Sequence, residues 1–416
     1  MCPTGMSFVD LATMRRPRLF LSVVFLRPAR LLLAAGVVSG AVPAAALAAQ
    51  QPPQIRTLPA PDAIYKEPFS AITPGSVREL SSGRVIVVDT RDRVVSLVDF
   101  TTGTATAIGR DGSGPGEFRQ PVRLFAAWGD TTYLVDRGNQ RLLVIGPDGK
   151  PLSSFRMEAM VSPGASATHG RYFYSQGPTV VFGASGPMPV DTAPILRFDR
   201  SRNLLDTIAW VHPPKIRMER SPGGGVSTVE GNPLNPADTW MALPDGRVAV
   251  IRAADYHVDF VYANGRVTRG APIPYVPVRV TSADKVAEEE RRNRARQNAG
   301  RGRSLTPGGA SDAPAQGAPP PNNAPLPPLK DWPEVKPPFR WIEAIHAGPN
   351  GEVWLQRTEP AGAKGSIFDV INALGTVTHQ VRVPEGWTLV AFGNGTVYTI
   401  KHDADDLVYL QRHRIP

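Results

Sequence analysis

Short runs of consecutive apolar residues, each followed by a turn, recur along the chain from residue 83 onward. Examples are Val-Ile-Val-Val at 85–88, Leu-Leu-Val-Ile at 142–145 and Val-Ala-Val-Ile at 248–251. Turn-forming residues follow such runs, as in Asp-Arg-Gly-Asn at 136–139 and Pro-Asp-Gly at 147–149. Because the apolar positions are consecutive and not alternating, they predict strands buried on both faces. We therefore expect hairpins assembled into sheets that stack face to face.

The same strand–turn–strand unit repeats. A glycine before the second strand marks five clear copies, at positions 83, 129, 246, 351 and 395. A sixth, weaker copy is expected around 171–174 or 179–182, closed by 195–198. A period in the forties with several short strands per repeat predicts an all-β fold, a six-bladed β-propeller. Residues 55–58 are the candidate for the strand that joins the first and last blades.

One repeat carries a more specific motif, over about residues 109–155. It contains Gly-Ser-Gly-Pro-Gly-Glu-Phe at 112–118, then Tyr-Leu-Val-Asp-Arg-Gly-Asn-Gln-Arg-Leu at 133–142. In these residues the chain resembles the NHL-repeat type of six-bladed propeller. The resemblance implies the fold; some propellers of this shape are metal-dependent hydrolases or lyases, such as lactonases and peptide-amidating lyases. For those it implies several inward ligands around one ion in the central channel, at positions that the sequence does not assign.

An insertion, residues 282–338, interrupts the repeats. Ser282 is expected to cap a solvated helix over 283–299. Two i,i+4 ion pairs are expected on it: Glu288 with Arg292 and Glu290 with Arg294. Residues 304–338 contain 11 prolines and indicate an extended or disordered linker. We therefore expect blades 1–4 in residues 49–281 and blades 5 and 6 in 339–416.

Composition narrows the classes of protein further. With 42% hydrophobic residues the chain is not disordered throughout, and a single cysteine, Cys2, excludes a disulfide scaffold. Five arginines, an apolar run at 31–38 and Ala-Leu-Ala at 46–48 follow the order of a bacterial secretory signal. A retained membrane anchor is the alternative, but Gly36, Gly40 and Pro43 interrupt the short apolar run. We expect residues 1–48 to be a cleaved signal peptide and the protein to be periplasmic or secreted.

The formal net charge of +9 does not indicate a nucleic-acid partner. Residues 1–48 account for +4 of it, and residues 282–303 for another +3. The predicted propeller is therefore nearly neutral, and export explains the charge better than nucleic-acid binding does. We expect no nucleic-acid partner, no membrane anchor after cleavage, and a monomer.

Two glycine- or serine-containing motifs have structural explanations. Gly112, Gly114 and Gly116 lack the spacing of a dinucleotide-binding loop, and Pro121 blocks the helix that such a loop requires. Ser282 and Lys285 match the S-x-x-K pattern of penicillin-recognising enzymes, but the partner motifs are absent. We expect a turn at the glycines, a helix cap at the serine, and no cofactor.

For two groups of polar residues, a structural role and a chemical role are both considered. Asp136, Asn139 and Arg141 lie in a predicted hairpin, where side-chain to backbone bonds are the natural role. A metal role is the less favoured hypothesis for a group near two strand ends: His346, His402, Asp403, Asp405 and Asp406. The sequence therefore assigns neither catalytic nor metal-binding residues.

Two functions stay open. The first is an exported propeller that binds a protein or a small molecule on its loop face or in its channel, since no catalytic constellation is visible. The alternative is a metal-dependent hydrolase or lyase, lactonase-like or amidating-lyase-like, with its site in the central channel.

Overall fold

The structure, a computed structural model, describes residues 53–156, 167–169, 172–183, 186–199, 201, 203–220, 226–229, 231–301, 328–340 and 344–415. The expected signal peptide and most of the expected linker lie outside these residues. One compact unit, residues 52–416, contains everything described below.

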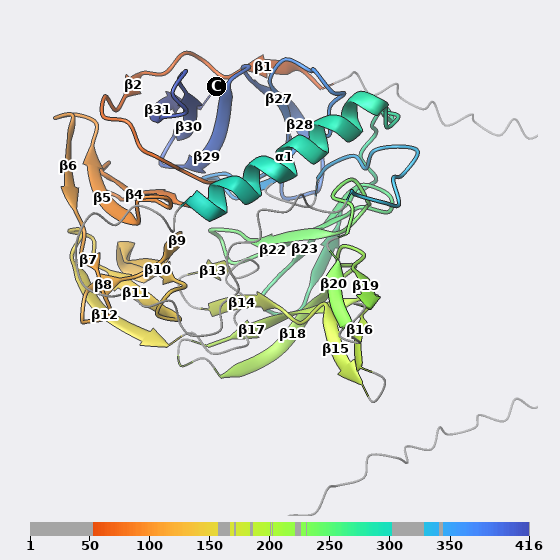
Figure 1. Ribbon diagram of the computed structural model, residues 1–416, viewed down its shortest axis with the longest axis horizontal. Coiled ribbons are helices and arrows are strands. Elements are labelled where there is room, and N and C mark those ends of the chain that lie inside the picture. The colour runs from red at the N-terminus through yellow and green to blue at the C-terminus, as the bar shows by residue number, and fades with distance from the viewer. Residues whose placement is uncertain are drawn as a thin grey trace, which may run out of the picture. The chain divides into compact units, whose positions relative to one another are not determined.

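Five four-stranded sheets and one five-stranded sheet form the six blades, arranged in a ring (Figure 1). Blades 1 to 3 consist of β3 (Val77–Glu79), β4 (Val85–Asp89), β5 (Val94–Asp99) and β6 (Thr104–Ala107); β9 (Pro121–Ala126), β10 (Thr132–Asp136), β11 (Arg141–Ile145) and β12 (Pro151–Arg156); β13 (Ala167–His169), β14 (Tyr172–Gln176), β17 (Ala193–Phe198) and β18 (Leu204–Val211). Blades 4 to 6 consist of β21 (Thr239–Ala242), β22 (Val248–Arg252), β23 (His257–Val261) and β24 (Val267–Arg269); β25 (Ile345–Ala347), β26 (Val353–Gln356), β27 (Ser366–Ile371) and β28 (Val377–Val383); β29 (Trp387–Phe392), β30 (Thr396–His402), β31 (Val408–Arg414) and β2 (Ala63–Ile64). The predicted six-bladed propeller is confirmed.

Smaller elements are added to this ring. They are β1 (Ile55–Thr57), the pair β7 (Arg110–Asp111) and β8 (Glu117–Phe118), the hairpins β15 (Val180–Gly183) with β16 (Gly186–Pro189) and β19 (Arg217–Arg220) with β20 (Val226–Val229), the short 3-10 turn η1 (Trp128–Asp130) and the helix α1 (Ser282–Arg301). The weak third repeat is therefore built on β14, as the first of its two predicted alternatives states, and 179–182 belongs to an inserted hairpin. No helix of the described residues combines the length and apolarity needed to cross a membrane.

The apolar core lies between the blades. Val85 and Val87 of β4 pack in the cluster that joins blade 1 to blade 6. Ile86 and Val88 of the same strand pack in the cluster that joins blade 1 to blade 2. Because neighbouring side chains on a strand point to opposite faces, the consecutive apolar residues cover both faces of one blade. Each of the six core clusters in the described residues joins a pair of neighbouring blades in this way.

The N-terminal segment closes the ring by a different strand from the predicted one. Strand β1 adds a fifth, parallel strand to blade 5 through β28, and does not join the last blade. The closing strand is β2, which pairs antiparallel with β31 of blade 6. Asp62 fixes it there through contacts of 3.2 Å to Arg412 and 3.1 Å to Arg414. The expectation that residues 55–58 close the ring is wrong because the chain needs several more residues to reach blade 6.

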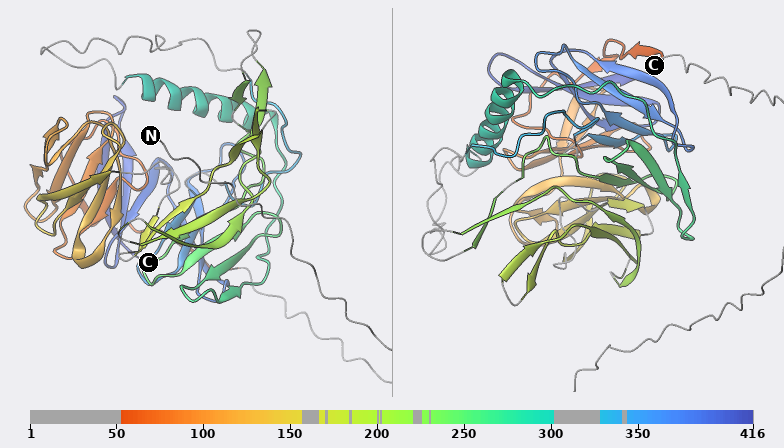
Figure 2. Two further views of the ribbon diagram at one scale, coloured as in Figure 1. Left: turned by 90° about the horizontal axis from the view of Figure 1, so that it is seen from below. Right: turned by 90° about the vertical axis from the view of Figure 1, so that its right-hand side faces the viewer.

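All the large additions lie on one face of the ring. The first strands of neighbouring blades contact one another and surround the centre. Since the chain reverses at every hairpin, each turn between a blade's second and third strands lies on the same side as the connections to the next blade. Hairpin β15–β16 occupies such a turn, while β7–β8, β19–β20 and α1 occupy connections. Figure 2 shows the helix and the two hairpins projecting on this side, which we call the loop-rich face.

The interface between the first and last blades gives a testable consequence of ring closure. Glu79 of β3 accepts hydrogen bonds from the hydroxyl of Tyr398 at 2.6 Å and from the backbone of Asn394 at 3.1 Å, both in blade 6. We expect Glu79→Met to lower the unfolding free energy by about 1–3 kcal/mol, because the buried Tyr398 hydroxyl loses its acceptor.

Equilibrium denaturation of Glu79→Met, Tyr398→Phe and the double variant measures this coupling. The exposed Glu67→Met serves as the control. Additive effects of the two single changes would contradict the role given to this hydrogen bond.

Candidate functional site

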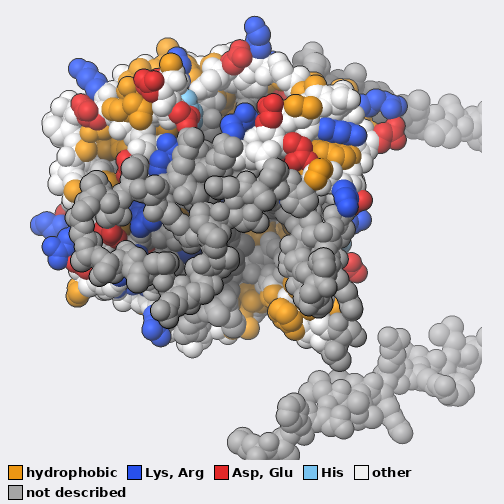
Figure 3. Space-filling view, viewed as in Figure 1, with side chains coloured by type: hydrophobic (Ala, Val, Ile, Leu, Met, Phe, Trp, Pro, Cys, Tyr) orange, Lys and Arg blue, Asp and Glu red, His pale blue; other side chains and the backbone are white. Residues whose placement is uncertain are grey.

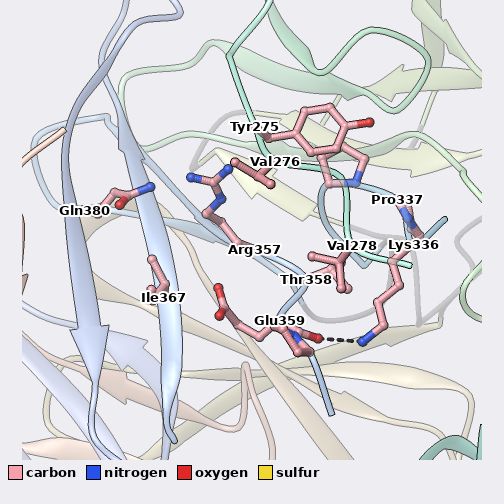
Figure 4. Close-up of a pocket in the computed structure, with 12 residues that line it drawn as sticks. Tyr275, Val276, Val278, Lys336, Pro337, Arg357, Thr358, Glu359, Ile367 and Gln380 are labelled. Carbon is pink, nitrogen blue, oxygen red and sulfur yellow. Dashed lines mark hydrogen bonds between the residues drawn. The ribbon is translucent and has the colours of Figure 1, made fainter. Parts of the chain in front are cut away.

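A pocket of about 220 Å³ lies on the loop-rich face, beside blade 5 (Figure 4). Four stretches of chain form it: the segment that leaves blade 4, the segment that returns to blade 5, the turn between β26 and β27 together with the start of β27, and the middle of β28. The residues that line it are Tyr275, Val276, Val278, Lys336, Pro337, Pro338, Arg357, Thr358, Glu359, Pro360, Ile367 and Gln380. The pocket thus combines apolar walls with a few charged and polar groups, as small-molecule sites do.

The returning segment, residues 328–340, is an extended strap against the propeller. Its Lys336 backbone donates to the carbonyl of Val278 at 2.8 Å, and the Thr358 backbone donates to the carbonyl of Pro338 at 3.0 Å. The strap therefore lies between the segment leaving blade 4 and the continuation of β26. Pro337 and Pro338 lack N–H donors, which explains why this pairing does not extend into a regular sheet. The residues expected as linker at 328–338 thus belong, in the structure, to a paired segment of the pocket wall.

Helix α1 holds the strap through buried charges. Lys336 and Asp284 are 5% and 6% exposed, and the Lys336 Nζ lies 2.5 Å from Asp284 Oδ1. Asp284 also accepts the backbone N–H of Ala361 at 2.9 Å, and the Lys336 ammonium donates to the Glu359 carbonyl at 2.7 Å. One carboxylate therefore connects the helix, the strap and the turn of blade 5.

The start of the helix differs by one residue from the expected cap. The hydroxyl of Thr281 accepts from the backbone of Asp284 at 3.3 Å, and Asp284 accepts the Thr281 backbone N–H at 2.8 Å. This reciprocal pair is a capping box, so Thr281 and not Ser282 is the N-cap.

Ion pairs along the helix also differ from those expected. Glu290 pairs with Arg294 at 3.8 Å, as predicted. Glu288, only 4% exposed, pairs with Arg291 and, at 2.8 Å, with Arg340 of the strap, and not with Arg292. The helix is therefore solvated on one side and docked by its acidic residues on the other, which the sequence did not predict.

Behind the pocket, a buried carboxylate lies next to Arg357. Asp369 is fully buried, accepts a hydrogen bond from the Tyr256 hydroxyl, and accepts one from Gln380 Nε2 at 2.7 Å. Arg357 Nη1 lies 3.7 Å from Asp369 Oδ1, which is beyond hydrogen-bond distance. Burial, together with the adjacent Asp369 carboxylate, holds the pKa of Tyr256 well above its ordinary value, so this hydroxyl stays a donor. Asp369 is thus satisfied by neutral donors, while Arg357 is directed toward the pocket (Figure 4).

The predicted hairpin trio has the structural role expected from its position. Asp136 accepts backbone N–H groups of Arg119 at 3.1 Å and of Asn139 at 3.3 Å. Arg141 donates to the carbonyl of Glu117 at 2.7 Å, and so ties the loop of Gly112, Gly114 and Gly116 to blade 2. These contacts bind the loop to the blade and leave no group of the trio directed at the pocket described above.

Of the candidate metal ligands, the structure brings together His402 and Asp406 but not His346. His346 belongs to β25 at the centre of the ring, near the rings of Phe368 and Phe392 at 5.9 and 6.2 Å. Burial and the positive charge of Arg123, in the opposite blade, lower the pKa of His346 to about 4. His402 lies at the end of β30 and pairs with Asp406 at 3.0 Å. Within the described residues no three His, Cys, Asp or Glu side chains are arranged to hold a metal ion.

Charges on the loop-rich face are mixed. Figure 3 shows basic and acidic side chains interspersed around its described rim. Near the pocket, Arg279 and Glu334 form such an exposed pair at 2.8 Å.

Arg357 and Glu359 were not identified from the sequence as candidate site residues, because neither belongs to a motif. Their only signal in the sequence is that both come shortly after an apolar strand.

The strand order defines the protein as a six-bladed β-propeller, and comparisons with known proteins add no closer assignment. No protein-family model matches the sequence, and no curated protein is significantly similar to it. A Bacteroides fragilis protein that is thought to be exported is 10% identical, with a TM-score of 0.45, covering 87% of this chain and 99% of that one. Virginiamycin B lyase from Staphylococcus aureus, solved with quinupristin, is 9% identical, with a TM-score of 0.35 and coverage of 83% and 96%. A gluconolactonase from Xanthomonas campestris is 8% identical, with a TM-score of 0.37 and coverage of 86% and 99%.

The charged contacts predict that the strap undocks in acid. Burial alone would raise the pKa of Asp284, but the hydrogen bonds from Lys336 and Thr281 lower it below its ordinary value of 3.8. A lowered pKa means that the stabilisation is present above the ordinary value and is lost as the pH falls through the folded-state value. We expect hydrogen exchange in 282–294 and 328–338, corrected for intrinsic rates, to accelerate below about pH 4.

In Lys336→Met the buried Asp284 loses its partner, so the same segments should exchange fast at neutral pH, with a local cost of about 3–5 kcal/mol. Glu290→Gln, which alters an exposed pair, is the control. Unchanged exchange in Lys336→Met would show that the ion pair does not hold the strap.

The separation of His346 from His402 gives a prediction about metal. We expect protein purified without added metal to show the same melting temperature with and without a chelator. Metal analysis of the same sample gives an independent reading. Near-stoichiometric calcium or zinc, or a fall in melting temperature with chelator, would instead favour the metal-dependent hydrolase or lyase.

Proposed function

We propose that the protein is an exported binding module that captures a small ligand in the pocket beside blade 5. Two features of the sequence and fold support this proposal. The order of charged, apolar and small residues up to 48 is that of a secretory signal. The additions to the propeller collect on one face, where the strap and blade 5 enclose the pocket.

The state of Arg357 carries the proposal. Its side chain is 20% exposed, and its guanidinium makes no hydrogen bond to any residue that the structure describes; its nearest charged partner there is Asp369 at 3.7 Å. The N–H donors of the guanidinium therefore lack hydrogen bonds to these residues. A ligand carboxylate or another planar anion would supply those bonds in the paired geometry that a guanidinium favours. The pocket is therefore preformed for a small anionic group.

Ligand-observed NMR with a set of small carboxylates, amines and amino acids tests the proposal. We expect carboxylate-containing compounds to bind, and Arg357→Met to weaken them at least tenfold, because the charge-assisted bonds are lost. Lys364→Gln is the matched control, since Lys364 is an exposed cation on the same turn and outside the pocket.

Two outcomes would contradict the function. One is the absence of binding by every compound in the set. The other is binding that Arg357→Met leaves unchanged while the variant keeps its melting temperature.

A further inference from the structure

The acidic group next to Arg357 gives the pocket a second charge. Arg357 and Glu359 are two residues apart on an extended stretch, so both side chains point to the same side of the chain. Figure 4 shows both of them at the pocket, with the Glu359 carboxylate on the side away from Tyr275. Along an extended chain this spacing separates the two side-chain origins by about 7 Å. The pocket thus presents a cation and an anion side by side.

These two charges are available to a ligand. Arg357 and Glu359 form no ion pair with each other. Among the described residues, the nearest charged partner of Arg357 is Asp369, whose carboxylate lies 3.7 Å away, beyond hydrogen-bond distance. The other charged group in the lining, the Lys336 ammonium, is 4% exposed and is neutralised by Asp284 at 2.5 Å. The pocket lining therefore offers a ligand one cation, Arg357, whose nearest charged partner is the buried Asp369, and one anion, Glu359.

Apolar side chains form the rest of the pocket. Val276 at its mouth is 82% exposed, and Tyr275 beside it is 38% exposed. The ring of Tyr275 is held by an edge contact with Tyr256, at 5.8 Å between centroids. Val278 and Ile367 add further apolar surface. A ligand with a hydrophobic side chain would cover this surface, and each buried methylene would add about 0.8 kcal/mol.

Size limits the ligand further. Pockets for drug-sized molecules typically measure about 300–1,000 Å³, and this one is about 220 Å³. The space therefore fits a molecule of one charged head and one side chain.

We propose that the pocket binds a free apolar α-amino acid, with its carboxylate on Arg357, its ammonium group on Glu359 and its side chain against Val276 and Ile367. This assignment rests on the proposed function and names its ligand class. An α-amino acid is the smallest molecule that offers both charges beside an apolar chain. A peptide C-terminus offers the carboxylate without the ammonium group, and a fatty acid likewise leaves Glu359 without a partner.

Calorimetric titration of the full chain with four matched probes tests the ligand class. Leucine carries both charges, 4-methylpentanoate lacks the ammonium group, N-acetyl-leucine replaces it by an amide, and leucinamide lacks the carboxylate. We expect leucine to bind at least tenfold more tightly than each of the other three, because a charge-assisted bond is lost in each comparison.

Glu359→Gln tests the contribution of the negative charge independently of Arg357. This variant should bind leucine and 4-methylpentanoate with similar affinity, whereas Arg357→Met should weaken both. Glu385→Gln, an exposed acid on a neighbouring turn outside the lining, is the control and should keep the wild-type preference. Circular dichroism and melting temperature verify that each variant is folded.

The possible failures are distinguishable. If leucine binds no more tightly than 4-methylpentanoate, or if Glu359→Gln keeps the preference for leucine, the amino-acid assignment is overturned while Arg357-dependent binding of carboxylates still supports the proposed function. If none of the four probes nor any other small carboxylate binds, both the assignment and the proposed function are overturned.

Discussion

The fold depends on burying both faces of every blade. In β4 the side chains alternate between two neighbours: Val85 and Val87 pack toward blade 6, and Ile86 and Val88 pack toward blade 2. A single blade cannot cover its own two faces, so no blade is stable without neighbours on both sides. The ring satisfies this requirement only when it closes, and closure brings the N-terminal β2 onto β31 of the last blade. Ring closure thereby fixes the positions of the inner strands and of every connection on the loop-rich face.

The helix attaches to the strap by charge, whereas the strap also packs Phe339 into the apolar core between blades 4 and 5. Asp284 and Glu288 are buried against Lys336 and Arg340, whereas little of the helix is hydrophobic. Buried ion pairs gain less net free energy than apolar packing does, because each charge loses its hydration. They are, however, directional, and they fix the register of the strap against blade 5. Such docking suits a wall that must position the backbone of Glu359 within the pocket.

The sequence allowed the ring to be predicted because blade strands have local signals. Consecutive apolar residues followed by Gly or Asp turns mark β4, β11 and β22 without reference to the rest of the chain. The closing strand had no such signal, since β2 is only Ala63–Ile64 and becomes a strand through its pairing with β31. The docked strap was missed for a related reason: prolines indicate extended chain, but pairing at Lys336 depends on Val278, far away in sequence. Arg357 and Glu359 likewise become pocket residues only because the strap lies opposite them, and the sequence does not show that the strap is there.

The pocket wall and the helix are joined by hydrogen bonds of Asp284, so their stabilities depend on each other. The Lys336 ammonium joins the Asp284 carboxylate to the Glu359 carbonyl, and Asp284 also holds the backbone of Ala361. Anything that displaces the helix therefore removes the partner of Lys336 and frees the turn that carries Arg357 and Glu359. By linkage, a ligand that bridges those two side chains stabilises the docked strap, and the docked strap raises the affinity for the ligand by the same factor. The charged helix that interrupts the repeats is thus connected to the pocket wall through the buried ion pairs of Asp284 with Lys336 and of Glu288 with Arg340.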